Sequence, residues 1–248
     1  MLDGYRYLRE SGKSALVRAG YADAVAAALL TGEGAVPDST SGRTTVHRFP
    51  FEEGEGIVRE YRRGGLLARV NRDAYLTNRP LAELRVVDYL WREGFPAPEP
   101  LGICWWRRMG LLRGCIATKA LEAIHLQDFL SAGRPPSPNV LRRVGEVIRR
   151  MHALGVCHGD LQVRNILIAG ETPYIIDFDK ARRLTRLTSR ARAANLFRLR
   201  RSFDKNRLEP RWYDAIAEGY GPLPYHALTA LAYTVRSRLS GRDRGSDT

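Results

Sequence analysis

The sequence has few cysteines, no long apolar run and no cluster of histidines. Each of these features excludes a class of protein. An odd cysteine count without metal-ligand spacing excludes a disulfide framework and predicts reduced, buried thiols in a cytosolic protein. The five histidines are scattered, which excludes a histidine-based metal hydrolase. No stretch approaches the ~18 apolar residues of a membrane-spanning helix. The N-terminus, "MLDGYRYLRESGK", has charges where an export signal needs an apolar segment.

Acidic residues are also scarce relative to basic ones. The chain has 40 Lys+Arg against 27 Asp+Glu, a net charge of +13, and nearly all of its basic residues are arginine. Ten arginines lie between Arg182 and Arg211 alone. This balance predicts an anionic partner, which charge alone leaves open between nucleic acid, an anionic membrane face and a phosphorylated ligand.

The order of predicted elements indicates an α+β protein. Its 248 residues, 44% of them apolar, suffice for one two-lobed domain with a sizeable core. Strands with one helix at 80–93 come first, and helices with an inserted hairpin follow, including a clearly amphipathic helix at 139–154. The predicted parts are an irregular N-terminal arm with one short helix, a β-rich lobe, a small helical lobe and a disordered tail, at 1–41, 42–121, 122–240 and 241–248.

The stretch "VCHGDLQVRNILIAGETPYIIDFD" contains the strongest chemical signal. Strands at 166–168 and 174–176, joined by the turn "AGETP", are expected to pair antiparallel with Asn165 facing Asp177. Asp160 lies on the loop that leads into the first strand. One end of the hairpin would then gather three oxygen-bearing side chains, and an Asn with an Asp suits Mg²⁺.

The spacing of these residues matches the motifs of phosphoryl transfer from ATP. H-x-D-x-x-x-x-N runs from His158 to Asn165, and D-F-x appears as Asp177-Phe178-Asp179. In this interpretation Asp160 accepts a hydroxyl proton, while Asn165 and Asp177 hold the metal. The alternative is a polar hairpin with ordinary Asx turns, which a lone D-x-x-x-x-N would favour.

A kinase also needs a strand cation held by a helix carboxylate. "GIVREY" places Arg59 where kinases usually carry Lys, and Glu83 lies on the apolar face of the predicted helix "RPLAELRVVDYL". A carboxylate on an apolar face requires a partner, and Arg59 is the candidate. Lys119 is a weaker rival for the same role, and a half-exposed Glu83 without a partner is the alternative interpretation.

Two kinase elements are weak or missing. G-x-G-x-x-G is absent, and "SGRTT" offers only Gly42, Thr44 and Thr45 for a phosphate loop. No A-P-E follows Asp177, and only 71 residues lie beyond it in the 248-residue chain. Protein kinases use that region to hold a peptide, so its absence favours a small-molecule, lipid or sugar acceptor.

Several stretches, in order, resemble the lipopolysaccharide kinase family, and within it the 3-deoxy-D-manno-octulosonic acid (Kdo) kinases. They are "SGRTTVHRF", "VREYRRGGLLARVNRDAYL", "AELRVVDYLWREGFPAPEPLG", "VGEVIRRMHALGVCHGDLQVRNILI", "IIDFDKAR" and "NLFRLRRSFDK". The resemblance runs from about Gly42 to Lys205. R-R-G-G and R-R-S-F-D-K are its specific parts, because general kinase motifs would not predict them. That family also carries Arg at the position of Arg59.

The resemblance implies a two-lobed protein-kinase-like fold and ATP- and Mg²⁺-dependent phosphorylation of the 4-hydroxyl of Kdo on a lipid A precursor. By matched motif, Asp160 would be the base, Asn165 and Asp177 the Mg²⁺ ligands, and Arg59 with Glu83 the nucleotide-positioning pair. His158 would brace the loop. The enzyme would lie peripherally on the anionic cytoplasmic face of the bacterial inner membrane, with no nucleic-acid partner; nothing in the sequence specifies an oligomeric state.

Three alternatives stay open at this point. A kinase of heptose or another core sugar shares the same motifs. A RIO- or Bud32-like protein kinase also lacks the activation segment, although R-R-G-G and R-R-S-F-D-K oppose it. A basic, nucleic-acid-binding or scaffold pseudokinase is compatible with the charge, but it has no physical need for an intact Asp160, Asn165 and Asp177.

Overall fold

The computed structural model describes residues 2–37, 46–61, 78–108, 111–132 and 137–222. The chain divides into two compact units, Met1–Glu122 and Ala123–Thr248. The division lies one residue beyond the lobe boundary predicted after Leu121, and the first 41 residues belong to the first unit. The predicted tail at 241–248 lies outside the described residues. No helix in the described ranges is long and apolar enough to cross a membrane.

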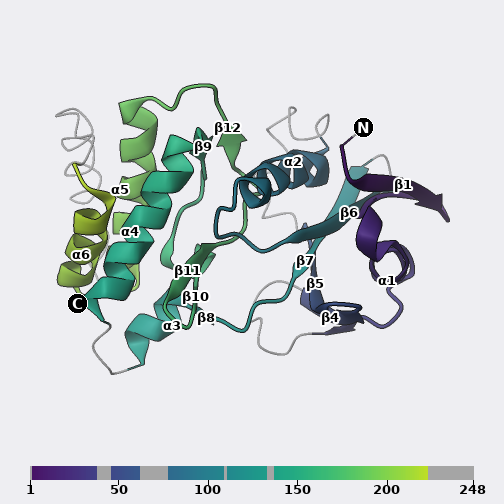
Figure 1. Cartoon of the computed structure of the whole chain (residues 1–248), viewed down its shortest axis with the longest axis horizontal. Coiled ribbons are helices and arrows are strands. Elements are labelled where there is room, and N and C mark those ends of the chain that lie inside the picture. Colours follow the sequence, from purple (N-terminus) through teal and green to yellow (C-terminus); the bar gives the residue numbers. More distant parts are fainter. Residues whose placement is uncertain (1, 38–45, 62–77, 109–110, 133–136, 223–248) are drawn as a thin grey trace, which may run out of the picture. The chain divides into compact units, whose positions relative to one another are not determined.

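The first unit contains a seven-stranded antiparallel sheet (Figure 1). Its strands are β1 (Tyr5–Glu10), β2 (Lys13–Arg18), β3 (Val36–Pro37), β4 (Val46–Phe51), β5 (Gly54–Glu60), β6 (Pro100–Arg108) and β7 (Leu111–Lys119). Their order across the sheet is β1-β2-β6-β7-β5-β4-β3. The hairpin β4–β5 and the pair β6–β7 lie within residues 42–121, the part of the chain predicted to form a β-rich lobe. Strand β5, which carries Arg59, is therefore held on both sides.

Helices contribute to the cores of the first unit. Helix α2 (Arg79–Arg92) is capped by Asn78, whose side chain accepts the Leu81 N–H at 3.2 Å, and it confirms the helix predicted at 80–93. Leu84 of α2 packs with residues from one face of the sheet, namely Leu16, Ile103 and Ile116. The alternate residues Ala15, Val17, Cys104 and Cys115 pack with Val25 and Leu29, from α1 (Ala22–Ala26) and the π-helical turn Ala27–Thr31. Both faces of the sheet are thus buried.

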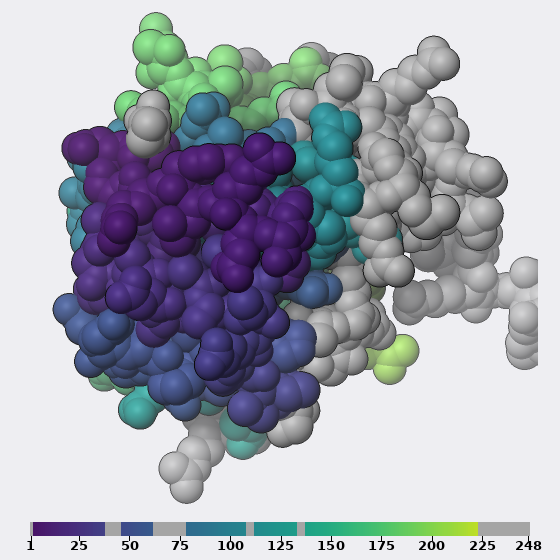
Figure 2. Space-filling view, turned by 90° about the vertical axis from the view of Figure 1, so that its right-hand side faces the viewer, coloured from purple at the N-terminus to yellow at the C-terminus, as the bar shows by residue number. Residues whose placement is uncertain are grey.

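The prediction of an irregular N-terminal arm is wrong for residues 5–18. They form the hairpin β1–β2, and β2 pairs in turn with β6. Ser11 and Gly12, both with positive φ (49° and 77°), make the two-residue turn that antiparallel strands favour. Three consecutive residues of β2 are buried, with Ala15 and Val17 in one core and Leu16 in the other, and the charges of the exposed edge strand β1 obscured this strand in the sequence. Residues of β1, β2 and α1 form a continuous surface, purple in Figure 2.

The second unit is mostly helical. Its helices are α3 (Leu126–Ser131), α4 (Pro138–Ala153), α5 (Ser189–Lys205) and α6 (Pro210–Tyr220), and α4 confirms the helix predicted at 139–154. Its short strands are β8 (Ile124–His125), β9 (Val156–Cys157), β10 (Ile166–Ala169), β11 (Thr172–Ile175) and β12 (Arg182–Arg183). They pair as β11-β10-β8 and β12-β9. Helices α4, α5 and α6 lie together in Figure 1.

Two glycines let α4 and α6 approach each other closely. A Cβ at Gly145 of α4 would overlap the Ile216 carbonyl oxygen, and a Cβ at Gly219 of α6 would overlap the Arg142 carbonyl oxygen. The buried face of α4, with Leu141, Val144, Ile148 and Met151, then forms much of the core of this unit. The core supports the loop that connects β9 to β10.

Candidate active site

The hairpin β10–β11 has a register that differs by one residue from the predicted one. Ile166 pairs with Ile175, and the Ile176 N–H donates to the Asn165 carbonyl at 3.0 Å, so Asn165 faces Ile176 and not Asp177. The reason is the turn: it contains only two residues, Gly170 and Glu171, between the pair Ala169 and Thr172. Gly170 has φ +58°, as the first position of a tight type II′-like hairpin requires. Asp177 is therefore the second residue beyond the last strand residue.

His158 is the buried centre of the loop between β9 and β10. Its Nε2 lies 2.9 Å from the Ile176 carbonyl oxygen, and its Nδ1 lies 3.3 Å from the Asp160 backbone nitrogen. A neutral ring with the proton on Nε2 satisfies both bonds, since Nδ1 must accept the Asp160 N–H. Burial lowers the pKa of His158, which favours the same neutral form. The ring also packs against Phe178 at 5.0 Å, so His158 braces the loop as predicted.

Asp160 lies next to a lysine that the sequence interpretation missed. Lys180 Nζ lies 2.9 Å from Asp160 Oδ2, and both side chains are partly or largely exposed, at 31% for Asp160 and 61% for Lys180. Gly159, with φ +73°, allows this approach, because a Cβ there would overlap the Lys180 carbonyl oxygen. The only signal in the sequence was that Lys180 directly follows "DFD". Its proximity to Asp160 depends on the close approach of Gly159 to the Lys180 backbone.

Asn165 and Asp177 emerge from the same end of the hairpin. Asn165 Nδ2 donates to the Asp160 carbonyl at 2.9 Å, which ties the loop to the strand. Within the described part of the chain, Asn165 Oδ1 takes no hydrogen bond from protein. Asp177 has φ +65°, a left-handed conformation that is uncommon for residues other than glycine and is often retained at functional sites.

A buried, uncharged hydrogen-bond network supports the loop from behind. Asn195 of α5 accepts the His158 backbone N–H with Oδ1 at 3.0 Å, and its Nδ2 donates to Cys157 Sγ at 3.0 Å. His152 of α4 lies 3.5 Å from the same Asn195 oxygen through Nε2, and its Nδ1 lies 3.0 Å from the Tyr220 hydroxyl. The sequence interpretation missed this network, because its members lie far apart in the chain.

In the first unit Arg59 and Glu83 form the predicted pair. Arg59 Nη2 donates to both carboxylate oxygens of Glu83, at 2.7 and 3.0 Å, and the Tyr61 hydroxyl donates to the same carboxylate. Glu83 is 3% exposed and the Arg59 side chain is 24% exposed. The Arg59 guanidinium also lies 5.2 Å from the Tyr61 ring centre. The carboxylate is buried because three hydrogen bonds compensate its lost hydration.

Lys119, the rival for this role, has a different partner. Lys119 is the last residue of β7, and its Nζ lies 3.2 Å from a carboxylate oxygen of Glu53. The predicted phosphate-loop residues Gly42, Thr44 and Thr45 lie outside the described residues. The same holds for the R-R-G-G stretch that follows Tyr61, so both assignments stay predictions.

The sheet-rich first unit, the helical second unit and the loop bearing Asp160 define a protein-kinase-like phosphotransferase. The structure of WaaP in complex with acyl carrier protein has a similar fold: the TM-score is 0.58, with 18% identity, over 86% of this chain and 90% of that chain. The chain belongs to the lipopolysaccharide kinase (Kdo/WaaP) family, whose model matches residues 27–220. The fold class and the family resemblance predicted from the sequence are therefore confirmed.

Curated relatives in this family are named 3-deoxy-D-manno-octulosonic acid kinase. The protein of Xylella fastidiosa (strain M12) is 34% identical over 192 residues, which cover 75% of this chain and 76% of that one. The protein of Xanthomonas campestris pv. campestris (strain B100) is 35% identical over 184 residues, 71% and 72% of the two chains. The protein of Pasteurella multocida (strain Pm70) is 37% identical over 161 residues, 60% and 65% of the two chains.

Proposed function

We propose that the protein transfers the γ-phosphate of ATP to the 4-hydroxyl of Kdo on a lipid A precursor during assembly of the lipopolysaccharide inner core. The observation that carries this proposal is the Asp160 loop in a chain whose 34–37% identical relatives are named Kdo kinases. Asp160, Asn165 and Asp177 lie at one hairpin end, which is the arrangement that phosphoryl transfer requires.

Asp160 acts as the general base. Its backbone N–H is held by His158 and its carbonyl by Asn165, so the residue is anchored on both sides of its side chain. The partly exposed carboxylate then accepts the proton of the Kdo hydroxyl as that oxygen attacks the phosphorus. Lys180, 2.9 Å from Asp160, contributes positive charge near the transferring phosphoryl group.

The oxygen atoms of Asn165 and Asp177 fit Mg²⁺. No group of three or more His, Cys, Asp or Glu in the described ranges forms a protein-only metal site. Mg²⁺ does not need one, since it takes one or two protein ligands and completes its shell with water and phosphate. Asn165 Oδ1, which takes no hydrogen bond from the described protein, is a suitable ligand beside the Asp177 carboxylate. Bound there, the ion neutralises charge on the nucleotide phosphates.

Arg59 binds the nucleotide phosphates in this proposal, oriented by Glu83. The guanidinium is planar, keeps its charge at any working pH, and presents five donors, of which Nη2 serves Glu83. Arginine in place of lysine suits a family that carries arginine at this position. The two Glu83 bonds and the Tyr61 ring restrict the orientation of the guanidinium.

The acceptor explains the arginine surplus. A Kdo-bearing lipid A precursor presents carboxylates and phosphates at the cytoplasmic face of the inner membrane, where we place the enzyme as a peripheral protein. Helix α5 exposes Arg190, Arg198 and Arg201. Each basic side chain near an anionic surface adds about 1 kcal/mol to binding.

The test is transfer of radiolabelled phosphate from ATP/Mg²⁺ to purified acceptors. A Kdo-lipid A precursor, a heptose-bearing core and a generic basic protein are compared, with Asp160→Asn as the blank. We expect label on the Kdo lipid alone. Label only on the heptose core or the protein would keep the kinase and discard the acceptor. Absence of label everywhere, together with absence of a Mg²⁺-dependent thermal shift by an ATP analogue, would favour the scaffold alternative.

A further inference from the structure

The second unit contains a cavity of about 560 Å³ at the C-terminal ends of α4 and α6 and the start of α5. Its lining includes Arg149 of α4, Tyr220 of α6, and Arg186, Thr188, Ser189 and Arg192 in and before α5. None of the proposed catalytic or metal-binding residues lines it. Its volume is typical of a small-molecule site.

Three guanidinium groups line this cavity without a carboxylate. Among the described residues, Arg149, Arg186 and Arg192 have no acidic partner, and no Asp or Glu contributes to the lining. Other arginines of the same unit are paired: Arg142 lies 3.0 Å from Glu218, and Arg143 lies 2.7 Å from Glu171. Three like charges around one cavity repel each other, and a bound anion would relieve that repulsion.

The polar groups of the cavity other than the three arginines are neutral, or lie at the N-terminus of α5, where the helix dipole attracts an anion. The Tyr220 hydroxyl lies 3.0 Å from Nδ1 of the buried His152. Burial lowers the pKa of His152 to about 4, so that ring carries no charge near neutral pH. Thr188 caps the 17-residue helix α5, accepting the Ala191 N–H at 3.2 Å, and the positive end of the helix dipole adds to the arginine charge.

We propose that this cavity binds a phosphate monoester through Arg149, Arg186 and Arg192. The three terminal oxygens of a phosphomonoester dianion match the forked donors of several guanidinium groups, and the cavity has room for the attached organic group. The ester is either a soluble metabolite or the phosphate headgroup of a lipid. The site is separate from the proposed transfer reaction, and its occupancy does not depend on catalysis.

The test measures binding of glycerol 3-phosphate to the full chain by calorimetry, with glycerol as the uncharged control. A saturating non-hydrolysable ATP analogue is present, so that nucleotide-phosphate sites are filled. The pocket variant is Arg186→Gln/Arg192→Gln, and its matched control is Arg6→Gln/Arg9→Gln, which removes equal charge from exposed positions of β1. Loss of charge-assisted hydrogen bonds is expected to weaken binding at least ~10-fold in the pocket variant and less than ~2-fold in the control.

A parallel arm separates the two sources of phosphate. Sedimentation with phosphatidylcholine vesicles, with and without phosphatidic acid, is measured for the same variants. The site is supported if the native chain and the control variant bind glycerol 3-phosphate or the phosphatidic acid vesicles and the pocket variant does not. The probe that binds then identifies the source of the phosphate as soluble or lipid. Equal binding by pocket and control variants, or no binding by the native chain in either arm, overturns it. Arg186→Gln alone, at an exposed position, serves if the double variant unfolds.

Discussion

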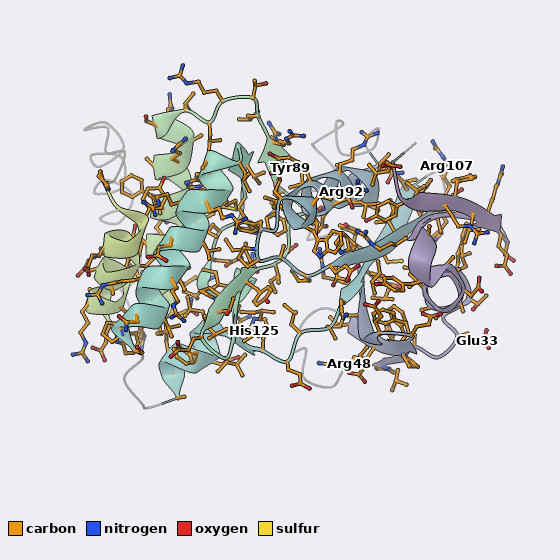
Figure 3. The ribbon with its side chains drawn as sticks, viewed as in Figure 1. Glu33, Arg48, Tyr89, Arg92, Arg107 and His125 are labelled. Atoms are coloured by element: carbon orange, nitrogen blue, oxygen red, sulfur yellow. The ribbon has the colours of Figure 1, made fainter. Side chains whose placement is uncertain are left out.

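The two units of the molecule hold their buried polar groups by different means. In the first unit, buried carboxylates are paired with arginines: Glu83 with Arg59, and Asp88 with Arg18 at 3.1 Å and with Arg92 at 2.8 Å. Arg92 lies on α2 in Figure 3. In the second unit, the groups behind the catalytic loop are uncharged imidazole, amide and hydroxyl groups.

This difference suits the two tasks that we propose. A guanidinium that binds phosphate must keep its charge while it is partly buried, and only an opposite charge with good geometry makes that state stable. A loop that presents a base must keep one shape, and neutral hydrogen bonds provide this without adding a field at the base. Removing one partner of a buried charged pair in the first unit should therefore lower the free energy of unfolding at any pH. The stabilisation that the neutral network gives the second unit should decrease in acid.

The largest expected effect is on phosphoryl transfer and comes from changing Asp160, whose side chain is partly exposed. Asp160→Asn keeps the size of the side chain and removes its basicity, so we expect transfer to fall about 10³-fold with nucleotide affinity nearly unchanged. Single-turnover kinetics and nucleotide binding on the same samples measure this. Asp128→Asn, on an exposed face of α3, is the control. Equal loss of nucleotide binding would remove the assignment of Asp160 as the base.

The next effect tests charged pairing in the first unit. Arg59→Ala leaves the Glu83 carboxylate buried without its cation, so we expect a loss of about 3 kcal/mol in the free energy of unfolding and a raised KM for ATP. Arg48→Ala breaks an exposed pair with Glu55 on neighbouring strands and should cost less than ~1 kcal/mol. Similar costs for the two variants, by chemical denaturation, would contradict the account. A change confined to the acceptor KM would place Arg59 elsewhere.

A smaller, pH-dependent effect tests the neutral network. The pKa of His152 is lowered by burial from 6.5 to about 4, so in acid the unfolded chain binds a proton that the folded chain does not. Its stabilising contribution is complete above pH 6.5 and is lost as pH falls toward 4, by about 2 kcal/mol between pH 7 and pH 5. Denaturation of His152→Gln at both pH values should show a correspondingly smaller acid loss.

The control for that measurement is His125→Gln, at the exposed histidine labelled on β8 in Figure 3. It should lose as much stability as the native protein between the two pH values. If His152→Gln instead follows the native protein, the buried network does not distinguish the second unit in the way proposed.

The smallest effect is expected at Lys180. Its pair with Asp160 is largely exposed, so Lys180→Ala should change the free energy of unfolding by less than ~0.5 kcal/mol. Transfer should still fall about tenfold, because positive charge near the reacting phosphoryl group is lost. Lys205→Ala, at an exposed position at the end of α5, provides the comparison. A kcat equal to that of the native enzyme would leave Lys180 with no part in the reaction.

Patterns local in the sequence predicted much of this arrangement. The Arg59–Glu83 pair followed from one rule, that a carboxylate on the apolar face of a helix needs a partner. The hairpin and the order of Asp160, Asn165 and Asp177 followed from motif spacing. The hairpin register was missed by one residue, because three positions of "AGETP", namely Ala169, Thr172 and Pro173, still belong to the strand ladder.

Features that depend on tertiary proximity were not predictable in the same way. Lys180 reaches Asp160 only because Gly159 lets two backbone segments touch. Asn195 and His158 are 37 residues apart, and a polar residue inside an arginine-rich helix gives no sign of its partner. The hairpin β1–β2 did leave a local signal, the Ser11-Gly12 turn, which the charges around it obscured.

The most direct test of the proposed function is the position of the phosphate in the product. The native enzyme is incubated with ATP/Mg²⁺ and a Kdo-lipid A precursor, and the purified product is analysed by phosphorus-proton correlation NMR. We expect one new phosphomonoester, coupled to the proton at position 4 of Kdo. An ester on another sugar or on the lipid A part, or hydrolysis of ATP without any ester, would contradict the proposed function.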